Sequence, residues 1–166
     1  MGRIELLKKI ISLYNQLIKL MTIQKEMLAD KRKVIYEYAK SCLGQKKAPI
    51  YKDYGCAEAL NNIVREALGE EVGGGASTYL MYQTLKNSPK FKKMAAPIIG
   101  DIIISPSGYG ATGKIPNGHV GIISDNGKIM SNNSLTLKWD EYYTLESWKK
   151  RYEKTGGYPV DFFQIL

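Results

Sequence analysis

The sequence contains few residues of the types that build metal sites and disulfide frameworks. Among its 166 residues are two cysteines, Cys42 and Cys56, and one histidine, His119. Zinc ligands usually occur in closely spaced pairs, whereas these three residues are scattered, so we expect neither a metal site nor another cofactor. Two cysteines cannot form a disulfide framework, although a single bridge between them would block a thiol nucleophile. Cys42 lies at the end of a helical stretch, and we predict that it is buried.

Long hydrophobic runs and a secretory signal peptide are absent as well. No apolar run approaches the roughly 20 residues that a membrane-spanning helix needs. Near the N-terminus, Lys8, Lys9 and Lys19 interrupt the apolar residues, and no small-residue cleavage site follows them. The 44% hydrophobic content is that of a globular protein. The length suffices for one domain with a hydrophobic core and an appended segment.

Acidic residues are scarce in the first part of the chain, so the positive charge is unevenly distributed. Residues 1–50 contain 11 Lys and Arg against 4 Asp and Glu, whereas residues 51–166 contain 13 against 12. A basic helix of this kind favours an anionic surface, either a membrane face or a cell-wall polymer, or it is simply a solvated lysine face. We expect no nucleic acid partner, because no basic patch interleaved with aromatic residues is present.

Residues 3–28 contain no glycine or proline and have the apolar periodicity of a helix. Six apolar residues follow a heptad: Ile4, Leu7, Ile11, Tyr14, Ile18 and Met21. Further leucines and isoleucines widen the apolar face beyond a two-stranded seam, so we expect this helix to pack on its own domain, on a second copy or on a bilayer surface. A second helical pattern runs over residues 30–43, and nothing separates it from the first. We predict an amphipathic basic helical segment at residues 1–45 and a functional domain at residues 46–166.

The most informative stretch begins at Tyr54-Gly55-Cys56. After Cys56, apolar residues recur at spacings of three and four as far as Leu68, which predicts a helix that begins at the cysteine. In a first helical turn, the unpaired backbone amides and the positive end of the helix dipole favour a thiolate over a thiol. Cys56 is therefore a candidate nucleophile. The alternative is a small buried apolar residue, which is the commoner role of a free cysteine.

The second half of the chain has the patterns of β-strands. The β-rich runs are residues 98–105, 119–124 and 160–165, and Asp125-Asn126-Gly127 predicts a hairpin that returns through residues 128–131. A short helix is expected near residues 146–152. Because helices come first and strands later, we predict an α+β fold with an antiparallel sheet.

His119 opens the predicted strand and is the candidate general base, although a lone histidine is more often structural. A catalytic imidazole needs a partner that fixes its orientation and tautomer. With a three-residue hairpin loop, position 119 faces Asn133, and Ser131 lies on the same face. With a two-residue loop, the facing residue is Asn132 instead.

An acyl-transfer site also needs donors for the oxyanion that forms during attack. The backbone amide of Cys56, at its helix start, is one candidate. Tyr54 or residues 52–53 are candidates for the second donor, and the sequence does not choose between them.

Three motifs and their order resemble the papain-like cell-wall amidases of the CHAP and NlpC/P60 type. The motifs are Tyr54-Gly55-Cys56-Ala57, Ile99-Gly100-Asp101-Ile102 and Gly118-His119-Val120-Gly121-Ile122, followed by Asp125-Asn126-Gly127-Lys128-Ile129. The resemblance covers roughly residues 50–166. It implies a papain-like fold in which Cys56 is the nucleophile and His119 the general base.

The resemblance leaves the third residue of the site open. In the NlpC/P60 pattern a polar residue, often histidine, aligns with Ser131, and in the CHAP pattern a glutamate aligns with Ser131 and an asparagine with Asn133. Because Asn133-Ser134 is similar to the Asn-Ser of papain-type strands, we expect Asn133 to orient His119, with Asn132 as the alternative. Asp101 is expected to be structural, accepting backbone amides at the start of its strand.

The resemblance implies a peptidoglycan hydrolase that cleaves an amide bond in or next to the stem peptide. It also implies an extracellular, cell-wall or periplasmic location, although no signal peptide is visible in the sequence. Two other functions fit the same residues. One is a Cys–His acyltransferase or transglutaminase-like enzyme, and the other is a non-catalytic wall- or membrane-binding module in which Cys56 is inert. The amphipathic N-terminal helix adds the expectation of a homo-oligomer.

Overall fold

A computed structural model of the chain describes residues 2–51, 54–108 and 114–166, without the side chains of residues 3 and 27–30. The chain divides into two compact units, Met1–Asp30 and Lys31–Leu166. Helix α1 (Arg3–Ser41) is a single helix, which decides the question of one helix or two. Its last turns belong to the second unit, because Ile35 and Ala39 are completely buried in the core of that unit. The second compact unit therefore begins at residue 31, and it includes the last turns of the helical segment predicted at residues 1–45.

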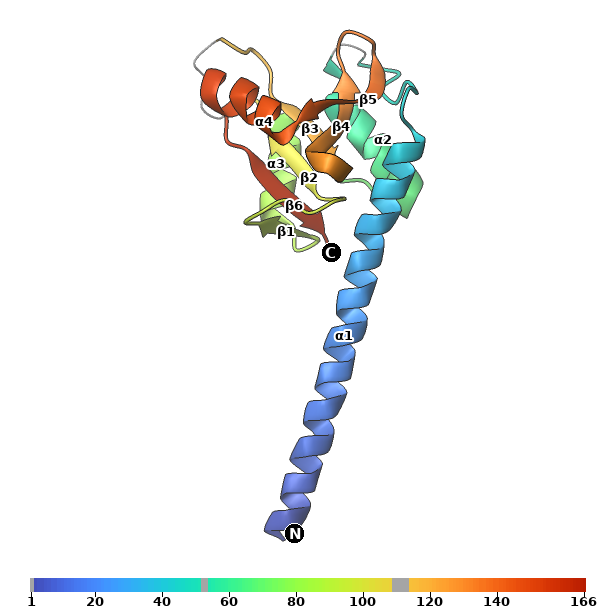
Figure 1. Cartoon of the computed structure of the whole chain (residues 1–166), viewed down its shortest axis with the longest axis vertical. Helices are drawn as coiled ribbons and strands as arrows, with labels where there is room; N and C mark the ends of the chain where they lie inside the picture. The colour runs from blue at the N-terminus through green and yellow to red at the C-terminus, as the bar shows by residue number, and fades with distance from the viewer. Residues whose placement is uncertain (1, 52–53, 109–113) are drawn as a thin grey trace. The chain divides into compact units, whose positions relative to one another are not determined.

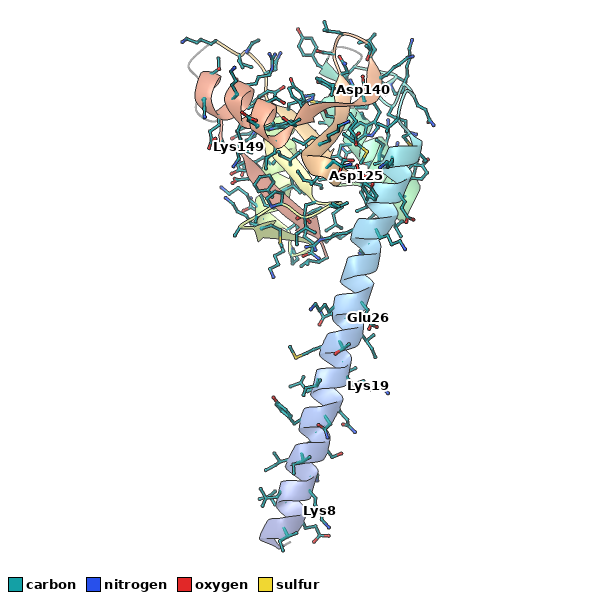
Figure 2. The ribbon with its side chains drawn as sticks, viewed as in Figure 1. Lys8, Lys19, Glu26, Asp125, Asp140 and Lys149 are labelled. Atoms are coloured by element: carbon teal, nitrogen blue, oxygen red, sulfur yellow. The ribbon has the colours of Figure 1, made fainter. Side chains whose placement is uncertain are left out.

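The first unit consists of helix alone, so its apolar side chains have nothing within the unit to pack against. The heptad residues are exposed, from 47% at Ile18 to 72% at Ile4. Lys8, Lys19 and Glu26 project from the same helix (Figure 2). Within the described ranges, no helix combines the length and the apolar character required to cross a bilayer.

The second unit contains one six-stranded sheet with strand order β1-β6-β2-β3-β4-β5 (Figure 1). The strands are β1 (Phe91–Met94), β2 (Ile102–Ser105), β3 (His119–Ile123), β4 (Lys128–Asn133), β5 (Lys138–Thr144) and β6 (Asp161–Ile165). The helices are α2 (Cys56–Leu68), α3 (Thr78–Asn87), α4 (Leu145–Trp148) and a π-helix, η3 (Lys149–Thr155). Each neighbouring pair of strands is antiparallel. The predicted α+β fold with an antiparallel sheet is confirmed.

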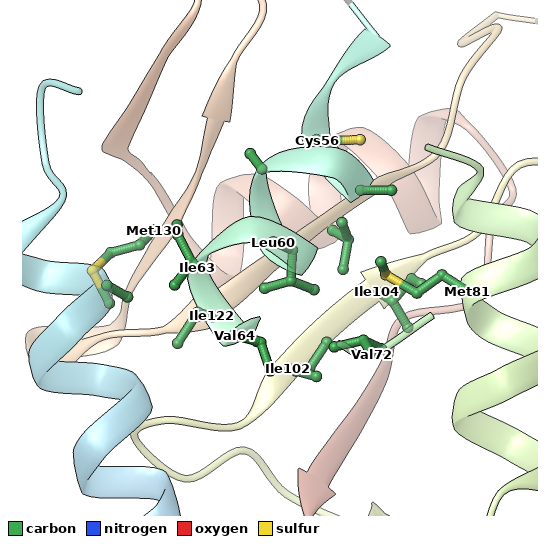
Figure 3. Close-up of a cluster of buried hydrophobic side chains, with 14 of the residues drawn as sticks. Cys56, Leu60, Ile63, Val64, Val72, Met81, Ile102, Ile104, Ile122 and Met130 are labelled. Atoms are coloured by element: carbon green, nitrogen blue, oxygen red, sulfur yellow. The ribbon is translucent and has the colours of Figure 1, made fainter. Parts of the chain in front are cut away.

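Helix α2 covers one face of the sheet and positions the candidate nucleophile. Its apolar residues Leu60, Ile63 and Val64 pack with Ile102 and Ile122 of the central strands (Figure 3). The helix ends as its sequence predicts, with Gly69 in the left-handed conformation (φ 75°) as C-cap. Burial of this apolar stripe holds the N-terminal end of α2, and with it Cys56, against the sheet.

The other face of the sheet carries a second core, formed with α4 and η3. It contains Ile103, Ile123 and Ile129 of the central strands together with Trp148 and Tyr152. The aromatic residues of α4 and η3 therefore cover the face to which the odd-numbered side chains of β3 point.

Strands β3 and β4 form the predicted hairpin. Gly121 pairs with Ser131, and Asn126 has a left-handed φ of 55° in the Asp125–Gly127 turn, so the loop has three residues. This register would place position 119 opposite 133. However, Asn133 pairs with Lys138 of β5, and its side chain accepts the Leu135 amide in the turn between β4 and β5.

Strand β2 is shorter than the β-rich run of residues 98–105 indicates. Gly100 adopts a left-handed φ of 88°, and a Cβ there would lie 2.5 Å from the Arg32 carbonyl oxygen of α1. Asp101 is fully buried; its carboxylate accepts the Ile98 amide at 2.9 Å and pairs with the Arg32 Nε at 2.9 Å. Asp101 is thus structural, as predicted.

Candidate active site

Cys56 is the first residue of α2 and is 9% exposed. The segment before it is held by Glu58, whose carboxylate accepts the amides of Ile50 at 3.1 Å and Tyr51 at 2.9 Å. The Cys56 sulfur accepts hydrogen bonds from the backbone amides of Val120 and Ala57. Val120 directly follows His119, so the candidate nucleophile contacts the strand that carries the candidate base.

The protonation state of Cys56 differs from the one its helix position favours. Burial raises the pKa of the thiol to about 11, although the amides of Val120, Ala57 and Cys56 itself lower it. The expected thiolate is therefore wrong for the resting site. The local helix effect has the predicted direction, but removal of water is the larger effect, because a buried anion loses its hydration.

His119 lies in an aromatic enclosure on the second-core face of the sheet. Its ring is stacked on Tyr152 with the centroids 5.7 Å apart and 15° between the planes, and Trp148 and Tyr143 lie at 5.2 and 5.9 Å. Burial, and secondarily the charge of Arg151, lowers the pKa of His119 to about 3. The imidazole is therefore neutral at physiological pH.

Tyr142 takes the position beside His119 that the sequence analysis assigned to an asparagine. Its hydroxyl lies 3.4 Å from the His119 Nε2, and burial raises the pKa of the phenol, so it stays protonated. A bulge in the pairing of β4 with β5, between Ile129 and Ser131, brings this tyrosine to the site. Bulges commonly redirect a side chain next to a functional site.

The other predicted site residues are divided between the site and its surroundings. Asn132 is 2% exposed and lines the same cavity as Cys56 and His119. Asn133 is outside the lining: its Oδ1 accepts the Leu135 amide at 3.0 Å, and its Nδ2 donates to Asp140 at 3.4 Å. The expected role of Asn133 in orienting the histidine therefore does not fit its geometry.

Tyr54 lines the cavity at its rim and is 67% exposed. Its backbone amide donates to the Tyr51 carbonyl at 2.9 Å and is therefore not available to an oxyanion. Its phenol remains a candidate contact for substrate. The other candidate donors, Lys52 and Asp53, lie outside the described residues.

A network of short side chains fixes the wall beside His119. Thr78 Oγ1 accepts the Ser107 amide at 3.1 Å, and Ser107 Oγ accepts the Gly118 amide at 2.8 Å. Gly118 allows this close approach, since a Cβ there would lie 2.1 Å from the Ser105 carbonyl oxygen. The start of α3 and the start of β3 are thus tied together across the cavity wall.

The cavity has a volume of about 220 Å³ and contains both Cys56 and His119 in its lining. Arg151 is the charged side chain of that lining, since His119 is neutral. Among the described residues, no group of three or more His, Cys, Asp or Glu side chains could bind a metal ion. Cys42 and Cys56 are both free, and Cys42 is buried as predicted. Cys56 and His119 thus line one cavity, and sulfur and imidazole are the two groups that thiol-based acyl transfer uses.

No family model matches the sequence, and no curated protein matches it. Similarity is found among solved structures. One similar chain belongs to the type VI native effector–immunity complex Tae3–Tai3 from Ralstonia pickettii. The match covers 80% of this chain and 96% of that one, with a TM-score of 0.51 and 16% identity. At this identity the similarity establishes the fold and does not assign the activity.

Several residues of the site were not found from the sequence: Tyr142, Tyr143, Trp148, Arg151 and Tyr152. They all lie in the aromatic and charged stretch of residues 139–152, in which only a short helix near residues 146–152 was expected. The concentration of aromatic residues there was a usable signal. These residues lie beside His119 because β5 pairs with β4. The charged residues of β5 interrupt the alternation that would identify it as a strand in the sequence.

Proposed function

We propose that this protein hydrolyses an amide bond of peptidoglycan, in or next to the stem peptide, with Cys56 as nucleophile and His119 as general base. One observation carries the proposal. A cysteine at a helix start and the single histidine of the chain, 63 residues apart, line one cavity, and the residue after the histidine donates its amide to the cysteine sulfur. The resemblance of the motifs to CHAP and NlpC/P60 enzymes supplies the substrate class.

The resting pair is neutral, because burial raises the pKa of the thiol and lowers that of the imidazole. The thiol proton therefore moves to His119 as the sulfur attacks the amide carbonyl, rather than beforehand. The imidazolium then protonates the leaving amine, and a thioester to Cys56 remains. His119 next removes a proton from water, which attacks the thioester and releases the carboxylic acid and the free thiol.

Tyr142 is the proposed positioning residue for this histidine. When Nε2–H of His119 donates to the Tyr142 hydroxyl oxygen, the unprotonated Nδ1 is left to accept the thiol proton. The backbone amide of Cys56 and the carboxamide of Asn132 are the proposed contacts for the oxyanion, and Tyr54 is proposed to contact the substrate at the rim.

We further propose that the protein acts where peptidoglycan lies, outside the cytoplasm. The fold similarity to a chain of a type VI effector–immunity complex supports this proposed location. The exposed amphipathic helix of the first unit is proposed to bind an anionic wall polymer, a membrane surface or a second copy of the chain.

The test compares wild type, Cys56→Ala and Cys42→Ala on purified sacculi, with new amino groups and released carboxyl groups quantified. We expect wild type and Cys42→Ala to cleave equally, because Cys42 is a buried thiol outside the cavity. Removal of the nucleophile in Cys56→Ala should lower the rate by on the order of 1,000-fold or more. Equal cleavage by wild type and Cys56→Ala would contradict the proposal.

An added amine distinguishes hydrolysis from acyl transfer by the same residues. Mass spectrometry of the products in the presence of an alkylamine would show amine adducts if the protein is an acyltransferase. Sacculi that bind the protein and release no new amine would instead favour the non-catalytic module.

A further inference from the structure

Arg151 is the one charged residue among the described residues that line the cavity. The other described lining residues have neutral polar, aromatic, aliphatic or small side chains. Across the described parts of the chain, no carboxylate forms an ion pair with Arg151. Its contacts are with tyrosines: the guanidinium carbon lies 5.6 Å from the centroid of the Tyr152 ring, and the side chain hydrogen bonds to the same residue.

Arg151 is an exposed residue whose charge acts on His119. Arg151 lies in the π-helix η3, where its carbonyl accepts the amide of Gly156, five residues later, at 3.0 Å. π-Helical turns are rare and often occur at functional sites. The stacking of His119 on Tyr152, next to Arg151, places the positive charge close enough to the imidazole to lower its pKa.

A positive charge in this position has a cost for the proposed chemistry. It opposes the imidazolium that forms when His119 accepts the thiol proton. A negative group on the substrate, bound to Arg151, would cancel this opposition and would supply a carboxylate partner, which no described residue provides. Guanidinium groups bind carboxylates through two parallel hydrogen bonds, which fixes orientation as well as charge.

We infer that Arg151 is a substrate-binding residue that selects an acyl donor with a free carboxylate close to the amide that is cleaved. This inference rests on the proposed function and deepens it, since it names the chemical class of substrate for the same cavity. Stem peptides in which that carboxylate is free would be substrates, and their amidated forms would bind and react poorly.

The experiment uses muropeptides in two forms, with carboxylates intact and with carboxylates converted to carboxamides by carbodiimide and ammonia. Binding is measured by calorimetry to the full chain carrying Cys56→Ala, which does not turn the ligand over. We expect the carboxylate form to bind about tenfold more tightly than the amidated form, as for one charge-assisted pair in a partly exposed site. Adding Arg151→Gln should abolish this preference by weakening only the carboxylate form.

Lys150→Gln is the matched control, because Lys150 is an exposed neighbour that carries the same charge and does not line the cavity. It removes one positive charge from the basic chain and should retain the preference. The inference is overturned if both forms bind equally to the Cys56→Ala protein, or if Arg151→Gln retains the preference.

Cleavage by the wild type separates this inference from the proposed function. If the wild type cleaves both muropeptide forms at the same rate, the proposed function stands and the role of Arg151 is wrong. If the wild type cleaves neither form and neither form binds, both the proposed function and the role of Arg151 are wrong. A faster reaction of the carboxylate form that disappears in Arg151→Gln supports both.

Discussion

Burial of a neutral histidine makes the stability of this protein sensitive to mild acid. A solvated histidine has a pKa of 6.5, and in the folded chain the pKa of His119 falls to about 3 because the aromatic enclosure excludes water. Between these two values the unfolded chain binds a proton that the folded chain does not. The stabilising contribution is therefore complete above pH 6.5 and is lost progressively as the pH falls toward 3.

The magnitude follows from the pKa difference. Well below pH 6.5 each pH unit removes about 1.4 kcal/mol from the free energy of unfolding, so a shift from about pH 8 to about pH 4.5 removes about 3 kcal/mol. His119→Phe keeps an aromatic ring in the enclosure and removes this proton-binding site. Its own packing cost is present at every pH and does not change the slope.

The assay is urea unfolding of wild type and His119→Phe at a series of pH values from about 8 to about 4. We expect the wild type to lose about 3 kcal/mol more than the variant between about pH 8 and about pH 4.5. Tyr142→Phe is the control, because it keeps the histidine and should retain the wild-type slope. Parallel slopes for wild type and His119→Phe would refute the reasoning, as would an NMR titration in which the single histidine of the folded chain has a pKa near 6.5.

The thiol and the Gly118 turn give two further predictions. Because burial raises the pKa of Cys56 to about 11, its alkylation by iodoacetamide should accelerate about tenfold per pH unit from about pH 7 to about pH 9.5. A plateau at or below about pH 7, measured by mass spectrometry, would instead indicate a thiolate–imidazolium pair. Gly118→Ala places a Cβ 2.1 Å from a backbone oxygen and should cost about 1–3 kcal/mol in urea unfolding. Gly127→Ala, where φ is 68° and the space is open, should cost about 1 kcal/mol, and the reverse order would contradict the packing argument.

Local patterns predicted the parts of the fold that depend on neighbouring residues. The helix from Cys56 was predicted from its own periodicity. Its glycine cap at Gly69 and the Ser77 cap of α3, whose hydroxyl accepts the Leu80 amide at 3.3 Å, are likewise features of short-range geometry. The three-residue loop at Asp125–Gly127 was one of the two predicted registers. These features need no information about distant parts of the chain.

Strands β1 and β5 were not predicted, because their residues lack a clear alternation. β1 is Phe-Lys-Lys-Met, and β5 is Lys-Trp-Asp-Glu-Tyr-Tyr-Thr. Both lie at the edges of the sheet, where one side of the strand is open and charged side chains are tolerated. Their strand conformation comes from pairing with β6 and β4 rather than from their own pattern.

For the site, the sequence by itself determined which atoms could react. One histidine and two cysteines leave few combinations, and the helical pattern after Cys56 indicated which cysteine begins a helix. Tertiary structure alone decided how those atoms behave. A bulge brings Tyr142 rather than Asn133 to the imidazole. Both candidate groups are buried, and burial reverses the expected ionisation of the thiol. The hydration of a thiol or an imidazole depends on the residues packed around it. Around Cys56 and His119 these residues come from helices and strands that are far apart in the sequence.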